Sequence, residues 1–199
     1  TPLEGALADY QECMEKLYCK ADYFAIDISC PNTPGLTKLQ NEAELAPLLK
    51  GIAEKRSELA DKTGRRVPIT VKISPDLDKD ALCNAADQFV RFGMDAVTAT
   101  NTTVSRKGIE GLPNSTMVGG LSGKPLFERS TQVLRILADH LKGTLPIIAS
   151  GGVMSAENAV AKMEAGASLV QLYTGFIYSG PELVADAADA IAEWQRNHQ

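Results

Sequence analysis

The sequence predicts an α/β protein of the (β/α)8 TIM-barrel class, of which the chain contains about five βα units. Short β-branched runs alternate with amphipathic helical segments along the whole chain, with no low-complexity stretch or domain linker between them. The runs are apolar on both faces, which is typical of parallel strands covered by helices. Polar or glycine-rich residues follow nearly every run, and barrel enzymes build their sites at the carboxyl ends of strands. An open doubly wound sheet shares this alternation, but the GxGxxG fingerprint of that fold is absent.

Six amphipathic segments are predicted as helices, the first of them ahead of any strand. In the helix predicted over residues 79–92, apolar residues recur at a spacing of three to four residues. Ser155 caps the helix predicted over 155–166, and Pro181 opens the last helix, 181–194, at the position that tolerates proline best. Pro47 is compatible only with the first turn of the helix predicted over 41–61. The predicted helices cover residues 7–20, 41–61, 79–92, 125–141, 155–166 and 181–194.

Five runs rich in β-branched residues are predicted as strands that alternate with these helices. The second run, VPITVKI, has almost no polar face. The predicted strands cover residues 23–28, 67–73, 95–100, 145–150 and 168–173. Because an eight-stranded barrel needs three more, the predicted barrel is incomplete.

Composition excludes several classes of protein. With 199 residues, 44% hydrophobic and 23% charged, the chain suits one globular unit with an ordinary core. A net charge of −5 argues against nucleic acid as a partner. The sequence has no run of 18 apolar residues and no signal-peptide pattern at its start. Four cysteines without CxxC spacing and two histidines favour reduced thiols in a cytosolic compartment and no metal site.

The turns after the last two strands predict a phosphate site. SGGV contains Gly151 and Gly152, and YTG contains Tyr173 and Thr174. In many barrels this pair of turns binds phosphate through backbone N–H groups and a helix N-terminus. The other interpretation is that both are ordinary tight turns.

Two more strand ends, and the long stretch between the third predicted strand and the next helix, carry candidate groups. Lys72 lies in an otherwise apolar strand, either as a cation facing an anionic ligand or as a lysine that extends to solvent. Asn101, in ATNTT, suits a planar, amide-rich ligand, although a side-chain-capped turn explains it as well. GGLSG, which ends at Gly123, indicates either a backbone close to a ligand or a flexible loop.

Cys30 lies just beyond the first predicted strand. Pro31 and Pro34 stiffen the loop that follows, and Gly35 lets it turn. A thiol in this position can act as a nucleophile or a general base, whereas a buried cysteine is usually an inert packing residue.

Six stretches, taken together, resemble the dihydroorotate dehydrogenase family: SCPNTPGL, VKISPDL, ATNTT, GGLSGKPL, IIASGGV and GASLVQLYTGFIYSGP. The resemblance runs in order over essentially the whole chain and is strongest to the membrane-associated, quinone-dependent class 2. It implies that residues 1–199 form the carboxyl-terminal portion of a single FMN-binding barrel domain, strands 4 to 8. The chain begins with Thr1 rather than methionine, so we expect it to be a piece of a longer protein.

The resemblance also implies an activity: FMN-dependent oxidation of (S)-dihydroorotate to orotate in de novo pyrimidine (UMP) biosynthesis. Cys30 would be the base that takes the proton from substrate C5, while hydride leaves C6 for flavin N5. The pyrimidine would be held by Asn32, Asn101 and Thr102. The flavin would be held by Lys72, Thr100, Gly123, Gly151, Gly152, Tyr173 and Thr174. Lys72 would also be a catalytic residue, because it would stabilise the charge that develops near the N1–C2 edge of the flavin.

The implied electron acceptor is quinone. The full-length protein would lie peripherally on the cytoplasmic side of the inner membrane, with membrane contact only through the missing amino-terminal part. Two residues depart from the class: Cys30 replaces its usual serine, and Asp27 replaces an asparagine that touches flavin and substrate. Because cysteine is the base of the soluble class, fumarate and NAD stay open as acceptors. Asp27 is not assigned to the site.

Two alternatives remain. Related FMN barrels that act on uracil-type rings also carry a cysteine in this loop. The chain could instead be a soluble, inert piece whose open barrel edges pair with a second copy. We expect weak or absent FMN binding by this chain alone.

Overall fold

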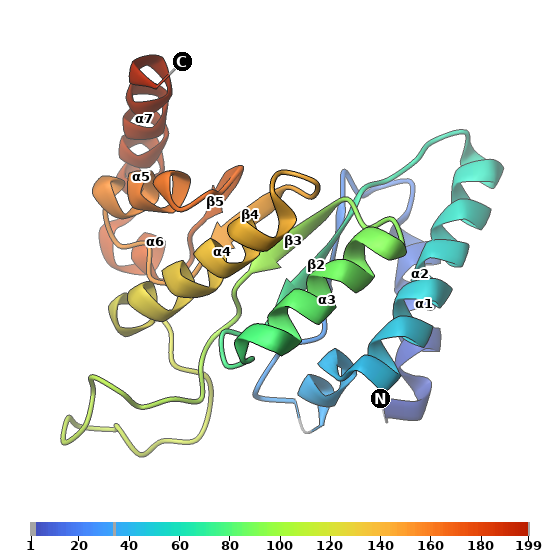
Figure 1. Ribbon diagram of the computed structural model, residues 1–199, viewed down its shortest axis with the longest axis horizontal. Helices are drawn as coiled ribbons and strands as arrows, with labels where there is room; N and C mark the ends of the chain where they lie inside the picture. The colour runs from blue at the N-terminus through green and yellow to red at the C-terminus, as the bar shows by residue number, and fades with distance from the viewer. Residues whose placement is uncertain (1–2, 34, 199) are drawn as a thin grey trace.

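Five parallel strands form one sheet in the computed structural model, which describes residues 3–33 and 35–198 (Figure 1). Their spatial order is β1-β2-β3-β4-β5, so each strand pairs with its neighbours in sequence. The bounds are β1 Phe24–Asp27, β2 Ile69–Ile73, β3 Ala96–Ala99, β4 Ile147–Ser150 and β5 Leu169–Gln171. All five predicted strands are therefore confirmed, although each is shorter than its apolar run.

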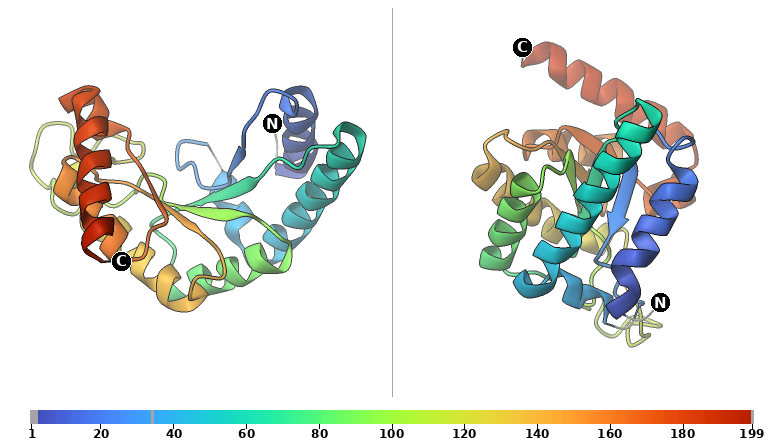
Figure 2. Two further views of the ribbon diagram at one scale, coloured as in Figure 1. Left: turned by 90° about the horizontal axis from the view of Figure 1, so that it is seen from above. Right: turned by 90° about the vertical axis from the view of Figure 1, so that its right-hand side faces the viewer.

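The sheet curves, and its helices cover the outer, convex side (Figure 2). A doubly wound sheet would reverse its strand order and place helices on both faces. The sequential order excludes that alternative and confirms the barrel-type α/β fold. The barrel is not closed: β1 and β5 are the two edges of the sheet.

The predicted helices all form, and four short helical segments accompany them. Ser155 caps α5 as predicted, with its Oγ accepting from the Asn158 backbone nitrogen at 3.3 Å. The main helices are α1 Ala6–Leu17, α2 Glu42–Thr63, α3 Lys79–Arg91, α4 Phe127–Leu141, α5 Ala156–Glu164 and α7 Glu182–Asn197. The short segments are the 3-10 turns η1 Leu3–Gly5, η2 Leu36–Gln40 and η3 Lys124–Leu126, and the helix α6 Thr174–Ser179. Within the described residues, none of the helices has the length and apolar character to cross a membrane.

Pro47 corrects one expectation. It lies inside α2, beyond the first turn that starts at residue 42. The helix continues through it because a proline removes a single backbone donor, and the neighbouring Leu48 and Leu49 are buried in the core. Burial of that face outweighs the lost hydrogen bond.

The two faces of the sheet differ in chemistry. On β2, the side chains of Ile69, Val71 and Ile73 are fully buried in the core that the helices form. The alternate residues Thr70 and Lys72 point to the inner face, where Thr70 Oγ1 lies 2.9 Å from Thr98 Oγ1 of β3. The expectation of strands that are apolar on both faces is therefore wrong for the inner face, since β-branched threonines fit a strand while carrying a hydroxyl.

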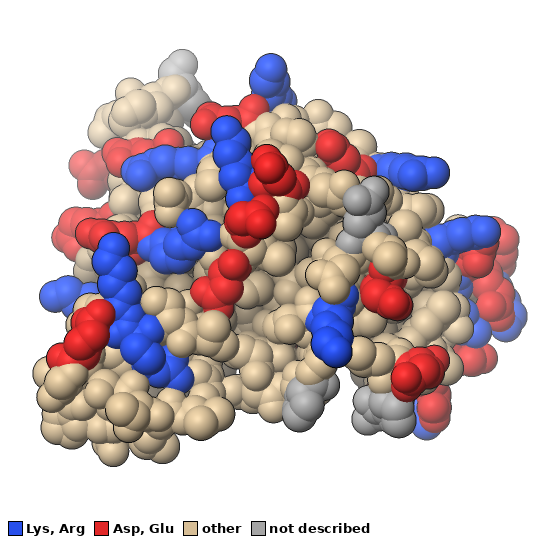
Figure 3. Space-filling model, turned by 60° about the horizontal axis from the view of Figure 1, so that its bottom comes forward, with Lys and Arg blue, Asp and Glu red and all other residues tan. Residues whose placement is uncertain are grey.

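The surface shows no separation of charge on the face in Figure 3. Basic and acidic side chains of the described residues are interspersed there, in keeping with the mild net charge of −5. This face therefore lacks the single-sign field that nucleic-acid binding uses.

Candidate functional site

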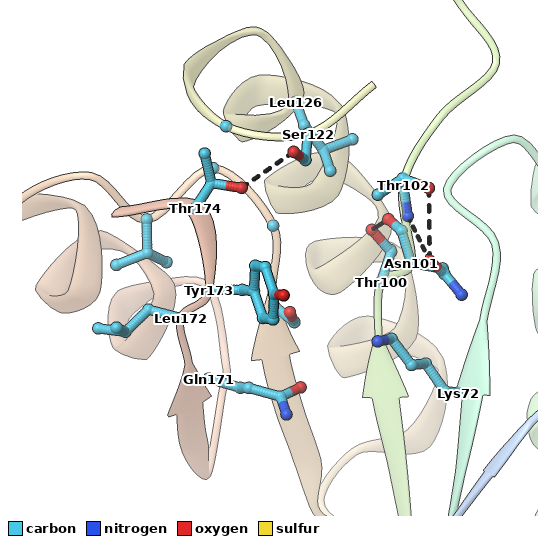
Figure 4. A pocket seen from close by; sticks show the side chains of 15 residues that line it. Lys72, Thr100, Asn101, Thr102, Ser122, Leu126, Gln171, Leu172, Tyr173 and Thr174 are labelled. Carbon is cyan, nitrogen blue, oxygen red and sulfur yellow. Dashed lines mark hydrogen bonds between the residues drawn. The ribbon is translucent and has the colours of Figure 1, made fainter. Parts of the chain in front are cut away.

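Most predicted site residues meet in one cavity at the carboxyl ends of β2 to β5 (Figure 4). Its volume is about 290 Å³. Carboxyl ends of parallel strands share one edge of the sheet, so the residues that follow each strand converge there. The predicted residues that line the cavity are Lys72, Thr100, Asn101, Thr102, Gly123, Gly151, Gly152, Tyr173 and Thr174.

The turn after β4 requires glycine. Gly152 has a φ of +78°, and a Cβ at this position would lie 2.5 Å from the backbone nitrogen of Phe127. Phe127 begins α4, so the turn packs directly against the start of that helix. At Gly151, a Cβ would meet Leu126 and Ser130 at 3.0 and 3.1 Å. Only glycine brings the backbone this close to α4.

The opposite wall comes from the residues before η3 and after β5. Thr174 Oγ1 donates to Ser122 Oγ at 2.9 Å and ties the two segments together. Beside it, a Cβ on Gly123 would lie 3.1 Å from Thr174 Cγ2. The backbone N–H groups of Gly123 and Gly152 have no acceptor among the residues that the structure describes. Free N–H groups at such a turn suit an anion.

Lys72 faces the same cavity from β2 (Figure 4). Its side chain is half-buried, and its ammonium makes no hydrogen bond or ion pair within the described part of the chain. A cation in that position has its charge available to an anionic ligand, because no side chain neutralises it.

Asn101 is already bonded within the protein. Its Nδ2 donates to Asp27 Oδ2 at 3.0 Å and to Ser29 Oγ at 3.1 Å. Its Oδ1 accepts from the Thr102 backbone nitrogen at 2.8 Å. Asp27, which the sequence left unassigned, therefore holds the amide of a predicted ligand-binding residue. Asp27 ends β1 and Asn101 follows β3, with β2 between these two strands, so the sequence carries no direct signal for this contact.

Cys30 and Asn32 lie outside this cavity. Cys30 is half-exposed and comes three residues after the end of β1. Asn32 Oδ1 accepts from the Gly120 backbone nitrogen at 3.0 Å, so it joins the loop after β1 to the loop before η3. The cavity and the Cys30 loop are linked through Ser29 and Asn101 rather than by a shared wall.

The loop after β1 has its own anchors. Gln40, at the end of η2, accepts from the Ser74 backbone nitrogen at 2.9 Å and is buried. The stiffening predicted for Pro31 acts next to Gly120, where a Cβ would lie 3.0 Å from Pro31 Cγ. Pro34 lies outside the described residues.

Tyr10 of α1 fixes the start of the same loop. Its hydroxyl donates to the Asp27 backbone oxygen at 2.7 Å. Burial, helped by the negative charges of Asp27 and Asp9, raises the pKa of Tyr10 to about 12. The hydroxyl therefore keeps its proton, and the hydrogen bond, well beyond neutral pH.

The sequence missed several residues that line the cavity. Gln171 is the one polar residue of β5, which is the same signal that singled out Lys72 in β2. Apolar members such as Leu126 carry no chemical signal in a sequence. The lining residues that were not assigned to the site are Ser122, Leu126, Ser150, Val153, Gln171 and Leu172, of which Ser122, Ser150 and Val153 lie in the GGLSG and SGGV stretches that the sequence singled out.

A second cavity, of about 1530 Å³, lies between the loop after β3 and the start of α4. Arg129 lines it, but its guanidinium already donates to the Pro75 and Leu77 carbonyl oxygens at 2.7 Å each. Asp76 accepts from Thr103 Oγ1 at 2.5 Å and shapes the same loop. These contacts connect the end of β2 to α4 and hold the loop.

The parallel sheet is covered on one side, and its strand ends carry a glycine-lined anion cradle and a lysine that has no partner among the described residues. This arrangement defines a barrel-type site suited to a phosphate-bearing ligand. The family model described as dihydroorotate dehydrogenase matches residues 4–194. The chain belongs to the dihydroorotate dehydrogenase family, and the resemblance seen in the sequence is confirmed.

Two similar proteins carry the name dihydroorotate dehydrogenase (quinone). The protein from Teredinibacter turnerae is 53% identical over 192 residues, which cover 96% of this chain and 57% of that protein. The protein from Methylococcus capsulatus is 54% identical and is covered to 56%. The chain therefore spans somewhat over half the length of these relatives.

Solved structures of the family share the fold. The crystal structure of DHODH from Eimeria tenella in complex with ferulenol superposes with a TM-score of 0.89 at 30% identity. The match covers 96% of this chain and 55% of that chain. The ligand-free type from the same organism gives a TM-score of 0.86 at 32% identity.

Proposed function

We propose that residues 1–199 form the carboxyl-terminal portion of a single FMN-binding barrel domain, in an enzyme that oxidises (S)-dihydroorotate to orotate in pyrimidine biosynthesis. The observation that carries this proposal is the pairing of Lys72, a half-buried ammonium without a partner in the described chain, with the glycine cradle in the same cavity. The names of the relatives support the same activity.

The residues present fit FMN. Gly123, Gly152 and Thr174 offer a close backbone and free N–H groups to its phosphate, with Gly151 and Tyr173 beside them. Thr100 and Lys72 face the cavity from the strands next to it and would contact the flavin. At about 290 Å³ the cavity is at the small end of ligand sites, so it suits the phosphate and ribityl end of FMN. When bound, FMN supplies the hydride acceptor.

Cys30 is the proposed base. A thiolate is a usable general base whereas a serine hydroxyl needs a partner to activate it, so Cys30 can take the proton from substrate C5. Asn32, Asn101 and Thr102 would bind the pyrimidine, while Asp27 and Ser29 hold the Asn101 amide in position. The loop of residues 30–40 would exclude water.

Quinone is the proposed electron acceptor, in line with the names of the relatives. The full-length protein would then lie peripherally at the cytoplasmic side of the inner membrane. Fumarate and NAD are the competing acceptors because Cys30 is typical of the soluble class. Parallel turnover assays of the full-length protein with the three acceptors separate them, and turnover with NAD or fumarate alone would exclude quinone.

Replacing the base tests the mechanism. Cys30→Ala in the full-length protein should keep FMN and lower turnover by about 10²–10⁴-fold, the usual size of a general-base contribution. Cys83→Ala is the matched control, since Cys83 is also a free, half-buried cysteine but lies on α3. Wild-type turnover by Cys30→Ala would remove Cys30 from the role of base.

A uracil-type substrate is the second candidate, and Cys30 is the observation that favours it. Titrating the FMN-loaded protein with orotate and with uracil distinguishes the two. A shift in the flavin spectrum with orotate alone supports the first proposal, and a shift with uracil alone supports the second.

A further inference from the structure

Lys162 is a buried cation on a helix that contributes none of the predicted site residues. It lies on α5 with 0% of its surface exposed, on the same buried face as Ala159 and Met163. Its Nζ donates to Ser130 Oγ at 2.7 Å and to Thr131 Oγ1 at 2.8 Å. Both hydroxyls belong to the beginning of α4, so the amine is enclosed beneath that helix end.

The amine is connected to the glycine turn of the cavity. Ser130 Oγ, which accepts from Lys162, lies 2.8 Å from the carbonyl oxygen of Gly151. Lys162 Nζ also lies 4.8 Å from the ring centroid of Phe127, the residue against whose backbone Gly152 packs. Two consecutive hydrogen bonds therefore join Lys162 to the turn, and it approaches the cavity from behind.

No acid within the described chain neutralises this charge. Arg135 of α4 is the charged group that acts on Lys162, and it opposes a positive charge. β4 and β5 carry no charged residue, and the acidic residues of α7 are exposed. The acidic side chains of α4 and α5 also occupy exposed positions: Glu128, Asp139, Glu157 and Glu164. Burial, followed by Arg135, lowers the pKa of Lys162 to about 7.

Both protonation states fit the local contacts. A neutral amine has two N–H donors, and Ser130 and Thr131 accept both. The third proton of the ammonium would face the Phe127 ring, which attracts a cation. What the ammonium lacks is a negative partner, and the free N–H groups on the other side of the glycine turn mark where an anion would bind.

We propose that Lys162 is the buried counter-cation of the phosphate group held at the Gly151–Gly152 turn, and that phosphate binding and protonation of Lys162 are coupled. This inference rests on the proposed function, which makes that phosphate part of FMN. Lys162 touches neither cofactor nor substrate, so it acts as a positioning residue through Ser130 and the turn.

The coupling follows from electrostatics. A phosphate dianion in front of the turn and an ammonium behind it are separated by protein rather than water, so they attract across a low dielectric. Because linkage is reciprocal, the factor by which protonation strengthens phosphate binding equals the factor by which phosphate favours protonation. A tenfold effect on affinity therefore corresponds to about one unit in the lysine pKa.

The direct test is a pH titration of Lys162 by NMR, in full-length protein labelled with ¹³C at lysine Cε and stripped of flavin. The Lys162 signal is assigned by its loss in Lys162→Arg. FMN should move its titration midpoint upward by about one unit, while riboflavin, which lacks the phosphate, should leave it unchanged. An unmoved midpoint with FMN bound overturns the inference and leaves the proposed function standing.

Absence of FMN binding would instead count against the proposed function. Inorganic phosphate and sulfate, a dianion that does not itself titrate in this range, then test the inference alone. An upward shift of the Lys162 midpoint with both anions supports it, and no shift with either overturns it.

Variants give a second readout. Lys162→Met should weaken FMN affinity by about tenfold near pH 6 while leaving riboflavin affinity unchanged, and Lys162→Arg should retain FMN binding. Lys50→Met, on the exposed side of α2, is the control and should bind FMN normally. A purely structural role predicts equal losses for FMN and riboflavin, so that result would overturn the coupling.

Discussion

The turn after β4 and the loop after β1 both follow a strand of the same sheet, yet they are held in different ways. The turn of residues 150–153 is fixed by backbone packing, because Gly152 leaves no room for a Cβ beside Phe127. The loop after β1 is anchored at its start by hydrogen bonds from Tyr10 to Asp27 and from Asn101 to Ser29, and at its end by the bond that Gln40 accepts from Ser74. The turn lines the cavity, whereas Cys30 and Asn32 lie outside it.

This difference separates the region proposed to bind phosphate, the glycine turn, from the region proposed to carry the base, the loop after β1. A backbone cradle has few ways to relax, so the phosphate end of the site is formed by the chain itself. A loop held by polar side chains can exchange those partners for a ligand's groups at small net cost, since one hydrogen bond replaces another. The region that carries the proposed base Cys30 is therefore the one that can rearrange when substrate enters.

Adding one methyl group to the turn after β4 should have the largest effect of the changes that test this difference between the two regions. Gly152→Ala should lower the free energy of unfolding by about 2–4 kcal/mol, because the Cβ overlaps the Phe127 backbone at a φ of +78°. The measurement is urea denaturation, combined with FMN binding, which should be lost.

Gly143→Ala is the matched control for Gly152→Ala. Its φ is +82°, but an added Cβ meets nothing within 4 Å. It should lower the free energy of unfolding by about 1 kcal/mol, the effect of backbone strain alone. Equal losses for the two variants would show that packing against Phe127 does not fix the turn.

Removing the shared amide is the next largest effect. Asn101→Ala removes the amide donor from Asp27 Oδ2 and Ser29 Oγ, while Asp27 Oδ1 keeps its bonds from Ser29, and should lower the free energy of unfolding by about 1–3 kcal/mol. Asn84→Ala on α3 is the control, with an expected change within about 0.5 kcal/mol. A double-mutant cycle with Asp27→Ala should show a coupling above about 0.5 kcal/mol, and zero coupling would refute the network.

The order of the elements and the residues at the strand ends were enough to predict the fold. Apolar spacing located the main helices and short β-branched runs located the strands, because burial of one helix stripe and of the outer sheet face dominates folding energy. Strand ends were less accurate, since ladder pairing stops where the sheet curves. The polar character of the inner face was not predicted, because the hydroxyls of Thr70 and Thr98 hydrogen-bond to each other across two strands, which a single sequence cannot reveal.

The sequence predicted site residues at positions where the residue type is unusual for the segment that contains it. Lys72 in an apolar strand and Gly151–Gly152 after another strand are local signals, and both line the cavity. Lys162 gave the same kind of signal on the buried face of α5 and was overlooked, because helix lysines usually reach solvent. The contact between Asp27 and Asn101 joins residues far apart in sequence, so only the folded chain brings it to light.

The smallest effect concerns the anchor of the loop after β1, which is titratable whereas the glycine turn is not. Tyr10→Phe removes the hydrogen bond to the Asp27 carbonyl and should lower the free energy of unfolding by about 1 kcal/mol at neutral pH. FMN affinity should be unchanged, because the cradle does not depend on this loop.

The pH dependence makes this last prediction specific. Because the pKa of Tyr10 rises from 10.0 to about 12 on folding, the folded state holds the proton more tightly than the unfolded state. The contribution of Tyr10 is therefore complete below pH 10 and is lost as the pH rises toward 12. Urea denaturation from pH 8 to about pH 11 should show the wild type losing its advantage over Tyr10→Phe, whereas Tyr23→Phe, at an exposed position, should follow the wild type throughout. A constant difference between wild type and Tyr10→Phe across this range would mean that the loop is held by packing, like the glycine turn, and the contrast between the two regions would disappear.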